Sequence, residues 1–138
     1  MPAQKDWRSQ NRHLQILKAA KKGRYGVMAA IAYNIEQILA NAAVQKSAVP
    51  ISIHLDHAQD ENLIKRAAKL PFDSIMVDML HYEKDVNLAK TAELAAYLQD
   101  RGIATEAESG RIEGGEEGVM DTAGLESVKT TVEEAEQQ

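Results

Sequence analysis

Three ionisable side chains lie together at the end of an apolar stretch, residues 50–57. The stretch begins with the mostly apolar residues 50–53 and continues through His54, Asp56 and His57. Burying such groups is costly unless a metal ion or a reaction uses them. Side chains alternate along a strand, so His54 and Asp56 share a face, and His57 joins them only if the backbone turns there. The spacing fits a metal or acid–base site, and it fits equally a histidine-rich strand end with a capping aspartate.

Acidic residues also follow two later apolar runs. Residues 74–77 lead into Asp78, and residues 102–105 lead into Glu106 and Glu108. Asp78 alone has a simple alternative, because many strands end in an aspartate that caps the next helix. Glu106 and Glu108 share a strand face, so they repel each other unless a cation lies between them, one is protonated, or one points to solvent. Together these residue types suit a divalent cation with open positions and Lewis-acid chemistry on a carbonyl.

Helices are predicted between these strands. The predicted helices cover residues 11–23, 35–48, 60–70, 85–100 and 125–138, and the predicted strands cover residues 25–32, 50–57, 74–78 and 103–108. This alternation predicts an α/β fold with parallel strands and right-handed crossovers. Function in such folds lies at the carboxyl ends of the strands, which is where Asn34 also falls.

Residues 110–118 differ from the rest of the chain, because they contain four glycines and three glutamates. Such a composition is typical of a mobile loop. The segment lacks the glycine patterns that bind phosphate, and its glutamates would repel a phosphate group. A loop that carries a carboxylate and closes over a site fits better.

The overall composition is that of an ordinary globular protein. A chain of 138 residues, 44% hydrophobic and 27% charged, is enough for one domain with a core. The absence of cysteine excludes disulfides and thiolate zinc sites, so histidine and carboxylate would have to bind any metal. The net charge of -5 disfavours a nucleic-acid partner. No apolar run suits a membrane span or a signal core, so we expect a cytoplasmic protein with no membrane contact.

Two motifs resemble the class II, metal-dependent fructose-bisphosphate aldolases, within the broader ketose-bisphosphate aldolases. The first is residues 53–58, and the second is residues 106–110 followed by residues 114–117. Both occur in the order and spacing of the family, and residues 50–121 follow it nearly continuously. The resemblance implies a zinc-dependent (β/α)8 TIM barrel of carbohydrate metabolism. Such an enzyme reversibly cleaves a ketose 1,6-bisphosphate, of fructose or tagatose type, to dihydroxyacetone phosphate and an aldehyde phosphate.

The resemblance also implies metal and substrate ligands. His57 corresponds to a ligand of the catalytic zinc ion. Asp78 and Glu108 resemble the carboxylates of a second, or alternative, metal position. Asn34, at the end of the first predicted strand, resembles a substrate-binding residue.

The proton-transfer residues are implied in the same way. Asp56 corresponds to the acid/base that exchanges a proton with the aldehyde-derived hydroxyl group. Glu116 resembles the loop glutamate that moves the proton at the dihydroxyacetone phosphate carbon, with its neighbour Glu117 as the open alternative. In this chemistry the zinc ion polarises the ketone, so no lysine Schiff base is required.

The chain departs from the family in length. A full barrel takes roughly 200 residues or more, and the later segments would supply two further zinc histidines and the loops that hold phosphate. Near residues 40–44 the first family helix runs into the tail of the second, so the second strand is missing. We therefore expect residues 1–138 to form a single incomplete domain, about the first half of the barrel. Its open sheet edges would favour a homo-oligomer.

Two functions of different classes follow. The first is a zinc-dependent class II aldolase acting on a phosphorylated ketose. The second is a truncated remnant without catalytic activity, which the missing histidines favour for this chain taken alone. A third explanation is an incomplete gene model of an intact enzyme. Zinc-dependent cleavage by the purified chain, lost in Asp56→Ala, would support the first.

Overall fold

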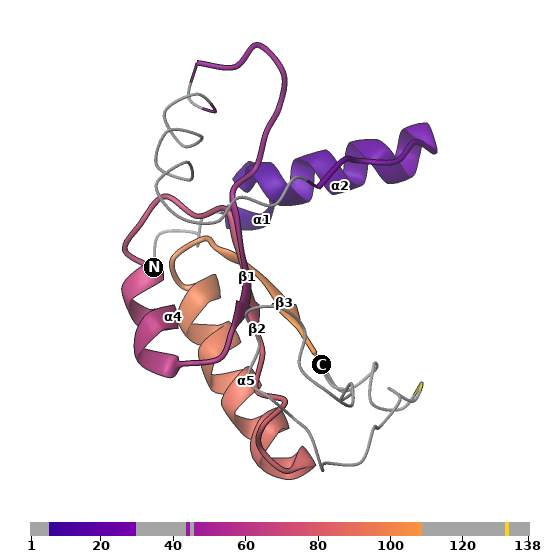
Figure 1. Ribbon diagram of the computed structural model, residues 1–138. Helices are drawn as coiled ribbons and strands as arrows, with labels where there is room; N and C mark the ends of the chain where they lie inside the picture. Colours follow the sequence, from indigo (N-terminus) through magenta and orange to yellow (C-terminus); the bar gives the residue numbers. More distant parts are fainter. Residues whose placement is uncertain (1–5, 30–43, 45, 109–131, 133–138) are drawn as a thin grey trace.

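The computed structural model describes residues 6–29, 44, 46–108 and 132, and the structural statements below concern these residues. The elements follow in the order α1 (Trp7–Gln10), α2 (Arg12–Gly23), β1 (His54–Ala58), α4 (Glu61–Ala67), β2 (Ser74–Val77), α5 (Lys84–Gln99) and β3 (Ala104–Ala107). The three strands are parallel and lie side by side in the order β1-β2-β3 (Figure 1). The predicted α/β fold with parallel strands is therefore confirmed.

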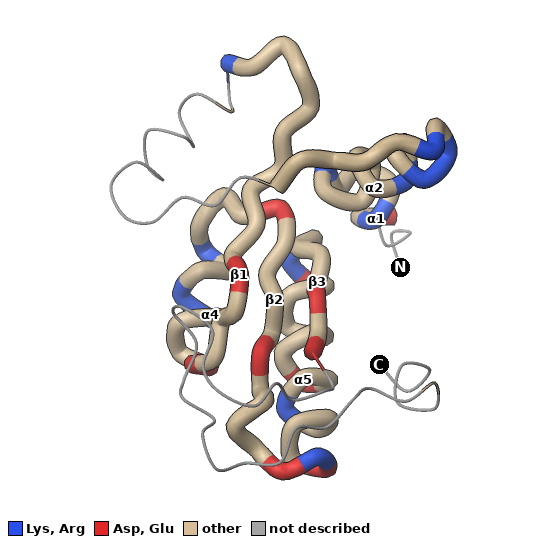
Figure 2. The backbone as a smooth tube through the Cα atoms, turned by 45° about the vertical axis from the view of Figure 1, so that its right-hand side comes forward, with Lys and Arg blue, Asp and Glu red and all other residues tan. Residues whose placement is uncertain are grey.

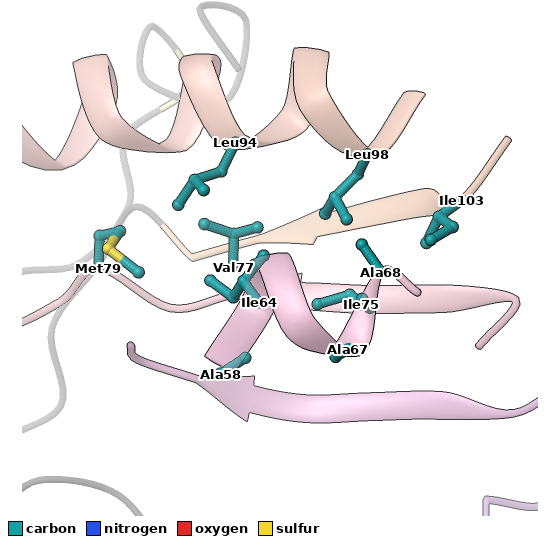
Figure 3. Packing of buried hydrophobic residues seen from close by; sticks show 10 residues of the cluster. All are labelled: Ala58, Ile64, Ala67, Ala68, Ile75, Val77, Met79, Leu94, Leu98 and Ile103. Atoms are coloured by element: carbon teal, nitrogen blue, oxygen red, sulfur yellow. The ribbon is translucent and has the colours of Figure 1, made fainter. Parts of the chain in front are cut away.

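The hydrophobic core lies between one face of the sheet and the helices α4 and α5 (Figure 3). Ile75 and Val77 of β2 point toward Ile64 of α4 and toward Leu94 and Leu98 of α5. None of these five side chains is more than 1% exposed. Burying one of them is worth about 1.5–3 kcal/mol. This packing fixes the strands against the helices and leaves the other sheet face for polar side chains.

Side-chain caps define the starts of two helices. The Asp60 Oδ1 atom accepts a hydrogen bond from the Leu63 N–H at 2.8 Å, and Asn11 Oδ1 accepts one from the Leu14 N–H at 3.0 Å. Such caps satisfy helix N–H groups that have no intrahelical partner. The residues predicted to start these helices are therefore N-caps, and α4 and α2 begin one residue later.

Asn11 also joins the amino-terminal helices to the sheet. Its Nδ2 atom donates to the carbonyl oxygen of Asp73 at 2.8 Å and to that of Gly102 at 2.9 Å. Asp73 precedes β2 and Gly102 precedes β3, so one buried amide bridges the amino ends of two strands. The short helix α1, which the sequence analysis did not predict, packs beside this point, with Trp7 near Gly102.

Two sequence predictions need correction. The strand predicted for residues 25–32 is wrong for residues 25–29, which form no strand and leave Tyr25, Val27 and Met28 at least half exposed. A strand needs a hydrogen-bonded neighbour, and among the described residues no strand pairs with this segment. The apolar side expected for the helix 85–100, made of Leu88, Thr91, Ala92, Ala95 and Leu98, is right for the buried Thr91 and Leu98 and wrong for Ala92, which is exposed while Leu94 is buried. Alanine carries too little apolar surface to orient a helix.

Other predicted elements lie outside the described residues. These are most of the helix 35–48, the loop 110–118 and nearly all of the helix 125–138. Among the described helices, none is long and apolar enough to cross a membrane.

A β-bulge in β1 does most to shape the site. Leu55 pairs with Ile75 and Ala58 pairs with Val77, so β1 spends three steps where β2 spends two. Within this stretch His57 has a φ of 44°, in the left-handed region. A bulge of this kind re-aims a side chain out of the regular alternation. The backbone turn that was expected to bring His57 toward the other site residues thus lies inside the strand, one residue before β1 ends.

Candidate metal centre

His57, Asp78 and Glu108 converge at the carboxyl ends of the three strands. Asp78 follows β2, Glu108 follows β3, and the bulge of β1 carries His57. The His57 Nδ1 atom lies 3.0 Å from Asp78 Oδ2 and 3.9 Å from Glu108 Oε2. One ligand atom from each residue falls within 4.8 Å of the others, which is close enough to share a cation. Figure 2 shows acidic residues on β1 and β3 and beside β2, and lysine and arginine residues on α2, α4 and α5.

Asp78 is held by several hydrogen bonds in a fully buried position. Its Oδ2 atom faces His57 Nδ1 and accepts from Gln59 Nε2 at 2.9 Å, while Oδ1 accepts from the Leu80 N–H at 3.2 Å. A buried carboxylate requires such partners, because desolvation of an unpaired charge is costly. Asp78 does not cap a helix, since α5 begins only at Lys84. The alternative interpretation of Asp78, as a strand-end aspartate that caps the next helix, is therefore wrong.

Buried polar residues of α5 support the strand end that carries Glu108. Asn87 Nδ2 donates to the Glu108 carbonyl oxygen at 3.3 Å, and Thr91 Oγ1 donates to Asn87 Oδ1 at 3.0 Å. Both Asn87 and Thr91 are buried. Asn87 could not be identified from the sequence, because a polar residue on the buried side of α5 does not follow from the apolar pattern of the helix. Gln59 could not be identified either, since nothing in a loop sequence indicates which side chain turns back toward the sheet.

Negative charge dominates the electrostatics around His57. Partial burial by itself lowers the pKa of this imidazole. The hydrogen bond to Asp78 and the charges of Asp56, Asp78 and Glu108 outweigh that effect, so the pKa of His57 is raised. Three carboxylates around one imidazole thus favour a positive charge at this position, from a proton or from a metal ion.

A second cluster lies beside the first, around His54. The His54 Nε2 atom is 3.6 Å from Asp56 Oδ1 and 3.5 Å from Glu106 Oε2, and Nδ1 is 3.0 Å from the Ser74 hydroxyl. The His13 ring of α2 stacks on His54 with 5.8 Å between centroids. Burial, and then the nearby His54, lower the pKa of His13. Because its Oε2 atom lies close to His54 Nε2, Glu106 associates with His54, and the Glu106 side chain is 57% exposed.

The glutamates of the third strand are thus divided between two histidines. Glu108 approaches His57, whereas Glu106 approaches His54. The repulsion expected for two carboxylates on one face is relieved in this way, with Glu106 toward solvent. Asp56, the predicted acid/base, lies at the edge of both clusters with its side chain 58% exposed. The other predicted residues, Asn34, Glu116 and Glu117, lie outside the described residues.

The chain matches proteins of one family in every comparison. A family profile described as class II fructose-bisphosphate aldolase matches residues 38–138. A Coccidioides immitis (strain RS) protein, provisionally named fructose-bisphosphate aldolase, is 44% identical over 167 residues, covering 92% of this chain and 55% of that protein. A Giardia intestinalis fructose-bisphosphate aldolase is 34% identical over 145 residues, covering 80% of this chain and 45% of that enzyme.

The structural comparison agrees. A crystal structure from Coccidioides immitis, also provisionally assigned as a fructose-1,6-bisphosphate aldolase, superimposes with a TM-score of 0.85 at 45% identity. The match covers 94% of this chain and 57% of that one, so the described fold corresponds to part of an aldolase barrel.

The chain spans about half the length of the curated relatives it matches. The 167 aligned positions of the first relative exceed the 138 residues of this chain. That relative therefore contains internal residues without a counterpart here, which agrees with the missing second strand. The profile match, the relatives and the fold lead to one conclusion. The chain belongs to the class II fructose-bisphosphate aldolase family.

Proposed function

We propose that this chain carries the acid–base half and part of the metal-binding site of a zinc-dependent aldolase. The substrate would be a phosphorylated ketose of fructose or tagatose type, cleaved to dihydroxyacetone phosphate and an aldehyde phosphate. The observation that carries the proposal is the convergence of His57, Asp78 and Glu108 at the carboxyl ends of three parallel strands. Phosphorylated sugars are metabolites of the cytoplasm, which fits the predicted location.

The donor set fits a divalent cation. One imidazole nitrogen and two carboxylate oxygens are ligands that zinc accepts, and the surrounding negative charge favours a cation. Gln59 and Asn87 would act behind these ligands, the first on the Asp78 carboxylate and the second on the strand end beside Glu108. Partners of this kind orient metal ligands and tune their affinity. When bound, the zinc ion would act as a Lewis acid on the ketone oxygen of the substrate.

The chain's own residues would handle the protons. Asp56 is exposed enough to reach a substrate, and we assign it the proton exchange with the aldehyde-derived hydroxyl group. His54 Nε2 lies 3.6 Å from Asp56 Oδ1, so this imidazole is the neighbour that would position the carboxylate. Glu116, outside the described residues, is assigned the proton at the dihydroxyacetone phosphate carbon.

One observation favours a second candidate, metal binding without turnover. The described metal group contains a single histidine. The remaining histidines of the sequence are His13, His54 and His81, and none of them belongs to that group. Catalytic zinc sites without cysteine commonly use three protein ligands, of which two or three are histidines. The chain by itself would then hold a cation weakly and release no product.

Zinc binding and cleavage, measured separately on the purified chain, test both candidates. Zinc affinity is measured by competition with a chromophoric chelator. Cleavage of fructose 1,6-bisphosphate and of tagatose 1,6-bisphosphate is followed by coupled reduction of the triose product. Turnover would be at least 100-fold lower in Asp56→Asn, with a much smaller loss of zinc affinity, because general acid–base catalysis contributes about 10²–10⁴-fold.

Asp100→Asn is the matched control, since this aspartate lies exposed at the end of α5. It removes the same charge at a distance from the site and should leave both measurements unchanged. Zinc binding without any cleavage in the unsubstituted chain would establish the second candidate. No zinc binding at all would refute both.

A further inference from the structure

A cavity of about 410 Å³ lies at the opposite end of the sheet from the metal centre. Its lining residues come from α1, the start of α2, the turn before β2 and the turn before β3. These turns are at the amino ends of the strands, where α1 and α2 lie in Figure 1. The volume falls in the range of about 300–1,000 Å³ that is usual for small-molecule sites. Nothing in the proposed aldolase chemistry uses this cavity.

The lining of the cavity is mixed, with polar groups predominating and an apolar, partly aromatic portion beside them. Trp7 and Phe72 contribute ring surface, and Leu70 and Ile103 contribute aliphatic surface. Leu70 remains 58% exposed, whereas Ile103 is only 5% exposed. An exposed leucine beside two half-buried rings gives a ligand apolar surface to cover. Asn11 closes the inner end, where its hydrogen bonds to Asp73 and Gly102 already satisfy the amide.

The charged groups of the lining have an excess of positive charge. Arg12 and Arg101 stand against one carboxylate, that of Asp73. The Asp73 Oδ2 atom accepts a hydrogen bond from the Ile53 N–H at 2.9 Å, so this carboxylate already serves the fold. The only acid of the lining is thus occupied, while two exposed arginines belong to the same lining.

Both arginines are held in place yet keep donors available. Arg12 donates one hydrogen bond, from its guanidinium group to the Ile51 carbonyl at 3.2 Å. Arg101 donates one to the Tyr97 carbonyl at 2.7 Å, and its guanidinium carbon lies 3.5 Å from the Tyr97 ring centroid. A guanidinium group has five N–H donors, which match the geometry of a carboxylate or phosphate. Stacking on Tyr97 reduces the entropy that Arg101 would lose on binding.

We infer that this cavity binds a planar aromatic anion, that is, an aromatic ring that carries a carboxylate, sulfonate or phosphate group. The ring lies against Trp7 and Phe72, and the anionic group is bound by Arg12 and Arg101. The site goes beyond the proposed aldolase function and does not depend on it. Its occupant is a small molecule, and its place at the amino ends of the strands separates it from the metal centre.

The single tryptophan of the chain provides a direct test. In a ¹H–¹⁵N correlation spectrum the indole N–H of Trp7 gives one cross-peak, which is followed during titration of the full chain with 2-naphthoate. We expect a saturable shift. Cyclohexanecarboxylate, which lacks the ring, and 2-naphthamide, which lacks the charge, should bind at least fivefold more weakly.

Variants assign the contacts. Arg101→Gln and Arg12→Gln are each expected to weaken 2-naphthoate binding at least fivefold, and Arg101→Lys should fall between Arg101→Gln and the unsubstituted chain. Arg24→Gln is the control, because Arg24 is exposed and does not line the cavity. A well-dispersed spectrum shows that each variant is folded. An absent or unsaturable shift, or equal binding by both arginine-to-glutamine variants and the control, would overturn the inference.

Discussion

At the scale of single residues, the candidate metal centre depends on the backbone positions from which three side chains extend. His57 reaches Asp78 and Glu108 only because the bulge in β1 turns its side chain out of the strand alternation. Asp78 is fully buried and fully hydrogen-bonded, so its carboxylate has a fixed position. Glu108 is the most adjustable of the three, since its side chain is 21% exposed. A substitution at Glu108 should therefore change the affinity for a cation with the least disturbance of the surrounding structure.

The first prediction concerns this glutamate. Glu108→Gln keeps the shape of the side chain and removes its charge, so zinc affinity should fall about tenfold or more, equivalent to about 1.4 kcal/mol. Competition with a chromophoric chelator measures the change. Glu93→Gln is the control, because Glu93 is 71% exposed on α5 and far from the group. Equal affinities in the two variants would mean that Glu108 is not a ligand.

The second prediction concerns pH. Burial by itself would lower the pKa of His57 from its ordinary value of about 6.5. The hydrogen bond to Asp78 and the charges of the other carboxylates outweigh burial, so the pKa is raised. Zinc needs the unprotonated imidazole, so a proton competes with it below the raised pKa. Zinc affinity should fall about tenfold per pH unit on the acid side and level off above that pKa.

In the metal-free chain, the contribution of His57 to the free energy of unfolding should change with pH in the opposite direction to zinc affinity. A raised pKa means that protonated His57 stabilises the fold at pH values below about 6.5, and that this contribution is lost as the pH rises through the raised value. Urea denaturation at a series of pH values, with and without zinc, separates the two effects. In His57→Gln both dependences should disappear.

At the scale of elements, single polar side chains connect helices to the sheet. Asn11 caps α2 and bridges the turns before β2 and β3. Lys90 of α5 pairs with Glu61 of α4 and lies over the Tyr82 ring. The Lys90–Glu61 pair is at the surface, where such interactions contribute little. Asn11 is buried, and its loss would remove the side-chain hydrogen bond to the Gly102 carbonyl, while the Asp73 carbonyl would keep the hydrogen bond from the Ala104 N–H at 3.0 Å.

The third prediction follows from that contrast. Asn11→Ala should lower the free energy of unfolding by about 2 kcal/mol, since it removes a helix cap and the side-chain hydrogen bond to the Gly102 carbonyl. Asn62→Ala, at an exposed position of α4, should change it by less than about 0.5 kcal/mol. Urea denaturation of both variants measures the difference. Similar values would show that the Asn11 bridge is not formed.

The fourth prediction tests the buried face of α5. Leu94→Ala should cost about 2–5 kcal/mol, because the side chain is 1% exposed within the core. Leu63→Ala on α4, where the leucine is 46% exposed, should cost clearly less. The same denaturation experiment compares the two. Equal costs would mean that the α5 face is rotated from the one described.

These elements also show what the sequence could predict. Helices and strands from residue 50 to residue 108 were predicted to within a few residues, since apolar runs and caps are local signals. The convergence of His57, Asp78 and Glu108 followed from the rule that parallel strands end at the same edge. The bulge and the support from Gln59 and Asn87 could not be predicted, because they depend on pairing register and on loop paths.

At the scale of the whole molecule, the metal group joins segments that are distant in sequence. His57, Asp78 and Glu108 lie at the ends of three different strands. These strands otherwise contact the hydrophobic core on one face of the sheet and pair with one another within the sheet. The chain corresponds to about half of its relatives' length. In such a fold a cation at the strand ends would add a cross-link among all three strands of the described sheet.

The fifth prediction is that zinc stabilises the chain. At a free zinc concentration 100 times the dissociation constant, the free energy of unfolding should rise by about 2.7 kcal/mol, and a chelator should reverse the gain. Thermal denaturation with zinc, with magnesium and with chelator measures it. A chain whose stability ignores zinc would contradict the metal centre at the level of the whole fold.

The left-handed backbone of His57 has an evolutionary consequence. A side chain at a φ of 44° costs about 1–2 kcal/mol relative to glycine. Glycine or asparagine would therefore suit the fold better at this position, and only a use for the imidazole opposes that drift. In descendants that lose the metal, we expect His57 to be replaced by glycine or asparagine early, with a gain in stability. The identity of residue 57 in such lineages would then date the end of selection for metal binding at this position.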